Sequence, residues 1–320
     1  MSFDSLASSK DPQVRQAHFL QSQPWFVRQG GSIPPIVSAS RGARLKILGL
    51  TWTHSEEGLY ALPQADISSA ADLCGKRISV PVQVNDPVDF WRATSRRHVL
   101  AALGQAGLGE NDVEWVKVPI DRSYVGTSTD RQDANGSLWD SRSMLGHQRE
   151  EAAALVSGKV DVIYSWGSVA TLLAAFTGAR LAVPLGRHVL SAEQGFQTMP
   201  GVLTATQDLI DWRPELVDLI LEHVLDSVAW AKEHPAEARR IIAAETGLPE
   251  DLVEAAWTPS VLDNLTVSLE EDQLQAIERQ IDFLNKAGFL AGPVDIDSLF
   301  APEYLHRARA KAGLDAALGA

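Results

Sequence analysis

Short apolar runs alternate with helical patterns through the first two thirds of the chain, and this alternation limits the fold more than any other feature. Short runs rich in apolar and β-branched residues predict buried parallel strands, and longer periodic stretches predict helices between them. The pattern therefore predicts an α/β sheet fold. The predicted strands are 44–52, 77–82, 112–120, 160–166, 179–185 and 201–206, and the predicted helices are 33–41, 68–73, 87–107, 147–157 and 167–177. Asp86 is the predicted N-cap of the helix at 87–107.

From Trp212 onward the pattern changes to helices alone, each beginning at or near a proline or an acidic residue. This helical C-terminal tail is predicted to pack against the rest of the protein. Residues 121–146 are polar and rich in turn formers, which is typical of a functional loop or a mobile insertion. A length of 320 residues exceeds the usual single core, so two domains or one large α/β domain are expected.

The charge balance argues against several classes of partner. The chain has 28 Lys and Arg against 41 Asp and Glu, a net charge of -13, which repels nucleic acid and anionic membrane surfaces. No run of 18 apolar residues and no secretory signal core is present, so no membrane insertion is expected. As written, the chain is expected to be cytoplasmic, or periplasmic if an N-terminal leader is missing.

One stretch near the front, "VRQGGSIPPI", combines a cation with a helix start. Arg28 precedes Gly30 and Gly31, which allow close backbone approach, and Ser32 is a predicted N-cap with prolines in the first helical turn. The N–H groups of such a helix start, together with Arg28, attract an oxyanion. The alternative is a well-capped helix with Arg28 as a surface charge.

Other side chains are weaker candidates for the same chemistry. His18 and Gln23 lie on the approach to Arg28 and can add hydrogen bonds to an anion. His147 with Glu150, and His54 with two following glutamates, lack a partner set with metal-site spacing, so solvated charged faces are favoured. No nucleotide-binding or nucleophile-elbow motif is found, and no metal or cofactor is expected.

Several residues are placed at the carboxyl ends of predicted strands, where ligands bind in open α/β sheets. Trp52 ends one strand, and Ser165 and Trp166 end another, so the rings are candidates to stack on the body of a ligand. Trp91, at the start of a predicted helix, is a weaker lid candidate. The alternative for all three tryptophans is core packing.

The motifs of the first 190 residues resemble a known group of proteins. "HF", "GG", "IPPI" and "LKILGLTW", followed by "DLCGKRISVPV" and "SGKVDVIYSW", are similar to the substrate-binding proteins for aliphatic sulfonates, nitrate and taurine. Within that group the chain most resembles the branch that cleaves 2'-hydroxybiphenyl-2-sulfinate. The resemblance implies a type II periplasmic-binding-protein fold, in which two α/β lobes enclose the ligand. The corresponding segments are lobe 1 at 1–80, lobe 2 at 81–188, and the return with the helical tail at 189–320.

The resemblance also implies roles for individual residues. His18, Arg28 and Gly31 match the histidine, arginine and glycine that surround the sulfinate group in the desulfinase branch, and Gln23 matches as well. A tyrosine of that branch is replaced by Gln21, so the resemblance does not imply an identical choice of substrate.

Two functions follow from the resemblance. The first is an ABC-transporter-type substrate-binding protein for a small organic anion of sulfonate or sulfinate type, with an ABC permease as its partner. The second is a carbon–sulfur hydrolase, in which His18 and Arg28 would act on an aryl sulfinate. The desulfinases carry a nucleophilic cysteine before the histidine motif, and only 17 residues precede His18 here. The single cysteine, Cys74, is interpreted as a small buried packing residue.

Overall fold

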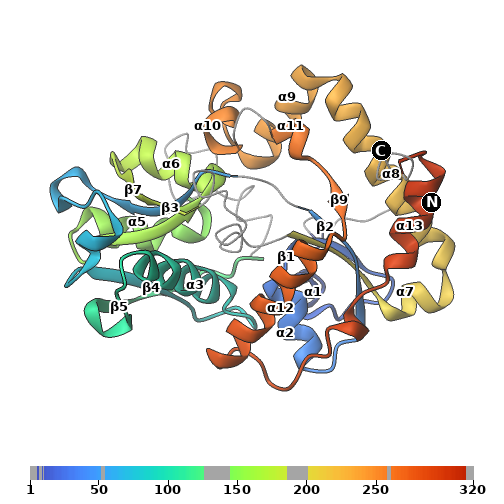
Figure 1. Cartoon of the computed structure of the whole chain (residues 1–320), viewed down its shortest axis with the longest axis horizontal. Helices are drawn as coiled ribbons and strands as arrows, with labels where there is room; N and C mark the ends of the chain where they lie inside the picture. Colours follow the sequence, from blue (N-terminus) through green and yellow to red (C-terminus); the bar gives the residue numbers. More distant parts are fainter. Residues whose placement is uncertain are drawn as a thin grey trace. The chain divides into compact units, whose positions relative to one another are not determined.

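The chain forms two compact units, each with its own sheet, in a computed structural model that describes residues 6, 9, 11–51, 55–125, 145–185, 201–257 and 261–314 (Figure 1). Unit 1 comprises Met1–Arg15, His54–Thr198 and Ile241–Pro259, and unit 2 comprises Gln16–Thr53, Met199–Arg240 and Ser260–Ala320. Residues 54–80, expected in the first lobe, belong to unit 1, because the strands of this segment pair within the sheet of that unit.

The sheet of unit 2 is antiparallel. Its order is β1 (Val27–Gly31), β8 (Gly201–Thr206), β2 (Leu45–Thr51) and β9 (Val267–Ser268). Helices α8 (Pro214–Glu233) and α13 (Pro302–Lys311) cover one face, where Leu48 and Leu203 pack with Leu221 and Leu305. Successive side chains of a strand point to opposite faces, so Thr204, the neighbour of Leu203, lies on the other face.

Other helices lie wholly or partly in unit 2, and of these α1 and α9 each have residues in both units. They are α1 (Pro12–Leu20), α2 (Ile33–Ser40), α7 (Gln207–Trp212), α9 (Pro235–Thr246), α11 (Val261–Asn264), α12 (Glu271–Lys286) and the 3-10 helix η7 (Asp297–Leu299). The hydroxyl of Ser38 on α2 donates to the carbonyl of Phe19 on α1, which ties these two helices together.

The sheet of unit 1 is mixed. Its order is β5 (Glu114–Ile120), β4 (Arg77–Gln83), β6 (Val162–Trp166), β3 (Glu57–Ala61) and β7 (Arg180–Pro184). Strand β4 runs parallel to β5 and β6, whereas β3 runs antiparallel to β6 and β7. The α-helices are α3 (Phe90–Gln105), α5 (Arg149–Val156), α6 (Gly167–Thr177) and α10 (Val253–Trp257), and the 3-10 helices are η2 (Pro63–Ala65), η3 (Ala70–Leu73), η4 (Glu110–Asp112), η5 (Gly146–Gln148) and η6 (Glu250–Leu252).

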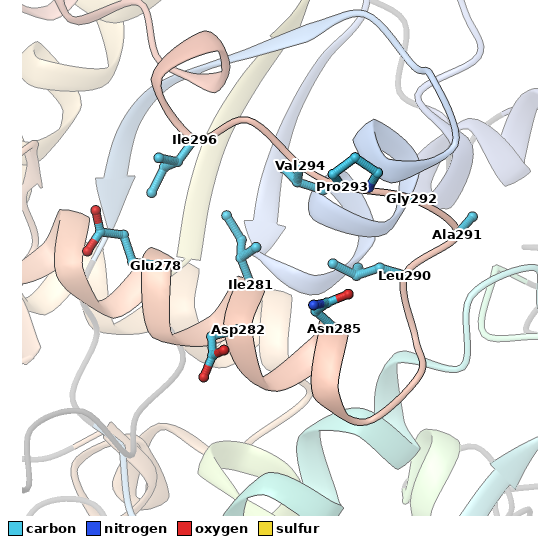
Figure 2. A pocket seen from close by; sticks show the side chains of 10 residues that line it. All are labelled: Glu278, Ile281, Asp282, Asn285, Leu290, Ala291, Gly292, Pro293, Val294 and Ile296. Atoms are coloured by element: carbon cyan, nitrogen blue, oxygen red, sulfur yellow. The ribbon is translucent and has the colours of Figure 1, made fainter.

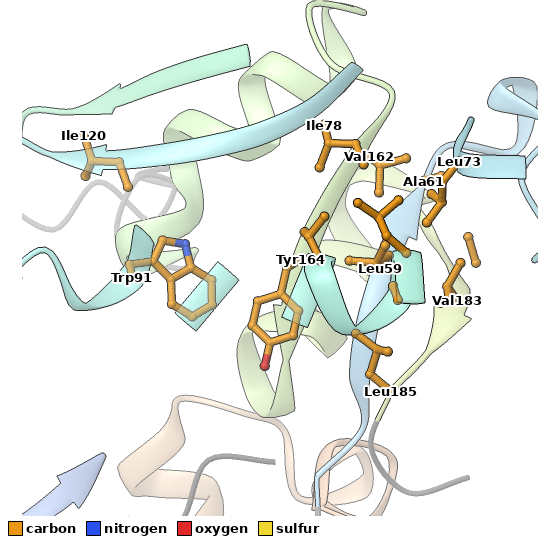
Figure 3. Packing of buried hydrophobic residues seen from close by; sticks show 14 residues of the cluster. Leu59, Ala61, Leu73, Ile78, Trp91, Ile120, Val162, Tyr164, Val183 and Leu185 are labelled. Carbon is orange, nitrogen blue, oxygen red and sulfur yellow. The ribbon is translucent and has the colours of Figure 1, made fainter. Parts of the chain in front are cut away.

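The core of unit 1 lies between this sheet and α3. Ile78 of β4, Leu59 of β3 and Tyr164 of β6 gather there with Trp91 from the first turn of α3 (Figure 3). Trp91 is 1% exposed, and its ring centroid is 5.5 Å from that of Tyr164. Aromatic pairs at this separation add to the stabilisation that burial provides.

The predicted α/β class with a helical C-terminal segment is confirmed, and two details of the prediction are wrong. Among the described strands, only the pairs β4–β5 and β4–β6 are parallel. The helix expected at 87–107 begins at Phe90, because Asp86 does not cap it: its carboxylate accepts bonds from Ser123 Oγ at 2.6 Å and from the N–H of Tyr124 at 2.9 Å. Within the described ranges, no helix is long and apolar enough to cross a membrane.

Candidate functional site

Strand β1 and helix α1 bring Arg28 and His18 together in unit 2. Arg28 is paired with Thr204 across β1 and β8, so its side chain lies on the face opposite α8 and α13. His18 is in the last turn of α1, and its Nε2 is 3.3 Å from Arg28 Nη2. A guanidinium only donates, so His18 Nε2 accepts this bond and the imidazole proton lies on Nδ1.

The imidazole of His18 is held in its neutral form. Burial, followed by the positive charge of Arg28, lowers the pKa of His18 to about 3. At neutral pH the ring therefore adds no charge and serves as an acceptor that orients the guanidinium. The only cation of this pair is Arg28.

The guanidinium of Arg28 lies along β1. Its Nη1 donates to the carbonyl of Gly31 at 3.0 Å, and the residue is 4% exposed. A Cβ atom on Gly30 would lie 2.9 Å from Arg28 Nη2, so the missing side chain of Gly30 makes room for the guanidinium. Gly31 is exposed, and a Cβ atom there would meet nothing within 4 Å. The charged group is thus fixed next to an open face of the backbone.

Ser32 stands at the N-cap position of α2, but the predicted side-chain cap is wrong. A capping hydroxyl accepts from the N–H of the second or third helical residue, and these are Pro34 and Pro35, which have no N–H. The same prolines reduce the number of N–H donors at this helix start below the number predicted. Ser32 is 0% exposed, and its Oγ has no hydrogen-bond partner among the described residues.

Gln21 and Thr204 complete the polar face around Arg28. Gln21 follows the end of α1 in the left-handed region, with φ 52°, and is 6% exposed. Its Oε1 is 3.3 Å from Thr204 Oγ1, which is also 3.3 Å from the carbonyl of Arg28. Nothing in the local sequence around Thr204 indicates a role, because only the antiparallel pairing of β1 with β8 brings it here.

The other predicted site residues have different surroundings. Gln23 is half-buried in unit 2. Trp52 and most of the polar loop predicted at 121–146 lie outside the described residues. In unit 1, the buried hydroxyl of Ser165 donates to Gln148, and the ring of Trp166 meets that of Trp257 edge-on at 5.8 Å. Ligand contacts for these residues stay predictions.

Trp91, the lid candidate, belongs to a buried polar network of unit 1 that sequence reasoning missed. Its indole N–H donates to Glu151 at 2.6 Å, and Ser79 Oγ donates to the same carboxylate at 2.6 Å. Burial raises the pKa of Glu151 to about 7, although these donors lower it. The hydrogen bond from Trp91 to Glu151, together with the packing of its ring in the core, explains why Trp91 is buried.

Of the two metal candidates considered from the sequence, His54 lies outside the described residues. Among the described residues, no three His, Cys, Asp or Glu side chains gather as a metal site would require. The ring of His147 instead meets Trp91 edge-on at 4.4 Å. Cys74 is exposed in unit 1 at the end of η3, so the prediction that it is a buried packing residue is wrong.

A separate pocket of unit 2 lies between α12 and the chain that follows it (Figure 2). It has a volume of about 630 Å3 and contains none of the residues around Arg28. Glu278 and Asp282 are among its lining residues, and carboxylates repel an anion. This pocket is therefore unsuited to the oxyanion that the sequence analysis predicts.

The known proteins that this chain resembles in sequence are desulfinases. The chain is 32% identical over 308 residues to 2'-hydroxybiphenyl-2-sulfinate desulfinase from Rhodococcus erythropolis and to that from Rhodococcus qingshengii, with 90% of this chain and 82% of each relative covered. No protein-family model matches the chain.

Solved structures show the same likeness. A mutant of the desulfurization enzyme DszB in complex with biphenyl-2-sulfinic acid matches with a TM-score of 0.75 and 28% identity, over 93% of this chain and 89% of that one. The aliphatic sulfonate-binding protein SsuA from Escherichia coli matches with a TM-score of 0.61 and 18% identity, over 91% and 79%. The second likeness confirms the predicted periplasmic-binding-protein-like fold.

Proposed function

This chain belongs to the family of 2'-hydroxybiphenyl-2-sulfinate desulfinase, and on that basis we propose that unit 2 binds the head group of a small organic oxyanion of sulfinate or sulfonate type. One observation carries the proposal: the buried guanidinium of Arg28 is fixed beside the open backbone of Gly31. A buried cation gains most when an anion meets it at short range, because little water screens the pair.

Each residue around Arg28 has a defined part in this binding. The neutral imidazole of His18 accepts a hydrogen bond from Arg28 Nη2, and the carbonyl of Gly31 accepts one from Arg28 Nη1. These two bonds fix the plane of the guanidinium. A planar guanidinium held at two points has a fixed orientation, and a guanidinium favours planar, two-oxygen contact with a head group. The open face at Gly31 lets the head group approach the backbone.

Calorimetric titration tests the proposal. We expect saturable binding of benzenesulfinate, biphenyl-2-sulfinate and benzenesulfonate, and no binding of neutral methyl phenyl sulfone, because the neutral compound has no charge for Arg28 to hold. Binding of the sulfone as tight as that of the anions would contradict the proposed site.

A substitution at Gly31 tests where the head group lies. Gly31→Ala adds a methyl group that meets no atom within 4 Å, so the free energy of unfolding should change by no more than about 0.5 kcal/mol. The same methyl group occupies the open face, and anion affinity is expected to fall about tenfold, or about 1.4 kcal/mol. Gly104→Ala, also free of close contacts, is the matched control and should leave affinity unchanged. Wild-type affinity in Gly31→Ala would place the head group elsewhere.

Carbon–sulfur hydrolysis is the second candidate function, favoured by the 32% identity to the desulfinases. In that reaction the bond between the ring carbon and sulfur breaks, and water supplies a proton to carbon and a hydroxyl to sulfur, which leaves as sulfite. Arg28 would stabilise charge on the sulfinate oxygens. Cys74, the single cysteine, is exposed in unit 1 and is not part of the unit 2 site. Assay of sulfite in the biphenyl-2-sulfinate titration separates binding alone from hydrolysis.

A further inference from the structure

Among the buried donors of unit 2 that lack a hydrogen-bond partner among the described residues, two belong to residues close to Arg28. They are the Oγ of Ser32 and the Nε2 of Gln21, in residues that are 0% and 6% exposed. Buried polar side chains in folded proteins almost always have a partner, because desolvating an unpaired donor is costly. Two such donors in one unit, near the same cation, point to an acceptor that arrives with a ligand.

The fold cannot satisfy Ser32 in the ordinary way. Its hydroxyl stands where a helix cap would accept from the second or third residue of α2, and Pro34 and Pro35 offer no N–H there. Ser38, further along the same helix, shows the contrast, since its hydroxyl donates to the carbonyl of Phe19. The Ser32 hydroxyl is left as a donor at the end of β1, next to Gly31.

Gln21 is likewise not explained by its own backbone. With φ 52° it occupies the left-handed region, which glycine and asparagine adopt more readily than glutamine. Its Oε1 contact with Thr204 is long, at 3.3 Å, and the single proton of that hydroxyl is shared with the carbonyl of Arg28. The amide group of Gln21 therefore has two N–H donors that the described residues do not use.

Printed contacts connect both donor residues to Arg28 through one neighbour each. His18 is in the last turn of α1, and Gln21 directly follows the end of that helix. His18 contacts the tip of Arg28, and Gln21 contacts Thr204, the cross-strand partner of Arg28. Ser32 follows Gly31, whose carbonyl binds the guanidinium. Gln21, at the end of α1, is thus connected to Arg28 through Thr204, and Ser32, at the end of β1, through Gly31.

We infer that Gln21 and Ser32 determine the specificity of the unit 2 site by donating hydrogen bonds to a ligand oxygen beyond the two that Arg28 holds. This inference rests on the proposed anion binding. A guanidinium fork matches two oxygens, and a third oxygen requires donors of its own. The site therefore selects a head group with three oxygens, such as a sulfonate, over one with two, such as a sulfinate or a carboxylate.

The test compares benzenesulfonate with benzenesulfinate by calorimetry at pH 7, where both are anions. We expect the wild type to bind the sulfonate about tenfold more tightly. Gln21→Met removes the donor amide, and Ser32→Ala removes the donor hydroxyl. Each substitution should lower this ratio about threefold, and the double variant should bind both anions alike. The sulfinate affinity should change little, because Arg28 is intact.

Two further variants separate specificity from folding. Gln21→Asn retracts the amide but suits the left-handed backbone, so it should keep or raise the melting temperature while lowering the sulfonate preference. Ser38→Ala removes a hydroxyl that already has a partner and should leave the ratio unchanged.

The outcomes are distinct. If the wild-type ratio persists in both Gln21→Asn and Ser32→Ala, or if the wild type shows no preference, the specificity inference is overturned and anion binding stands. If the wild type binds neither anion, the proposed function fails and the inference fails with it.

Discussion

Arg28→Gln is expected to weaken the binding of benzenesulfinate and benzenesulfonate at least about 100-fold, which corresponds to about 3 kcal/mol. Glutamine keeps hydrogen-bonding ability but has no charge, and a buried oxyanion without a countercharge is strongly disfavoured. Arg28 is 4% exposed, so water cannot replace its contribution as it would at the surface. Calorimetry of the variant against the same anions measures the loss.

Arg44→Gln is the matched control for this experiment. Arg44 is in the same unit, but its side chain is 77% exposed and pairs with Asp211 at 3.4 Å. Exposed ion pairs contribute little, so this variant should bind the anions as the wild type does. An equal loss in the two variants would mean that general surface charge, and not the site at Arg28, attracts the ligand.

Glu57→Gln is expected to become more stable relative to the wild type as pH rises from 5 to 8, by about 2 to 3 kcal/mol. Burial raises the pKa of Glu57 to about 7 from its usual 4.5, although a bond from Tyr164 and the charge of Arg97 lower it. The folded protein therefore holds a proton that the unfolded chain releases between pH 4.5 and 7. The contribution of Glu57 to the free energy of unfolding is therefore fully present below pH 4.5 and is lost as pH rises through 7.

The contacts of Glu57 make glutamine a close substitute. Its Oε2 accepts from the Tyr164 hydroxyl at 3.0 Å and is 4.0 Å from His98 Nε2, while its Oε1 has no partner among the described residues. Chemical unfolding at several pH values gives the difference between variant and wild type. Glu245→Gln, at an exposed position of α9, is the control. A constant difference for Glu57→Gln across this range would show that Glu57 does not exchange its proton on unfolding.

The pairing of His18 with Arg28 could be anticipated from the sequence, whereas the residues that complete the site could not. His18 and Arg28 are ten residues apart, within one recognisable motif. Thr204 is 176 residues from Arg28 and comes beside it only through the pairing of β8 with β1. Strand β1 itself, "VRQGG", has one apolar residue and two glycines, so its sequence carries no strand pattern.

The side-chain caps predicted at the starts of α3 and α2 are absent for different reasons. At α3, Asp86 is of a residue type that often caps helices, but its carboxylate accepts a hydrogen bond from Ser123, 37 residues away in the sequence. No local sequence pattern reveals this competing partner. At α2, the two prolines were visible in the sequence and already exclude a side-chain cap by Ser32, because each lacks an N–H. The error at α3 thus comes from a residue distant in the sequence, and the error at α2 comes from residues next to the predicted cap.

The prolines that follow Ser32 also have a thermodynamic consequence. Two consecutive pyrrolidine rings hold φ near -65°, and their presence restricts the residue before each of them. The junction between β1 and α2 thus has few conformations to lose when a ligand is captured. Since ordering mobile backbone consumes much of the free energy of association, this preorganised junction leaves more of the electrostatic attraction available as affinity.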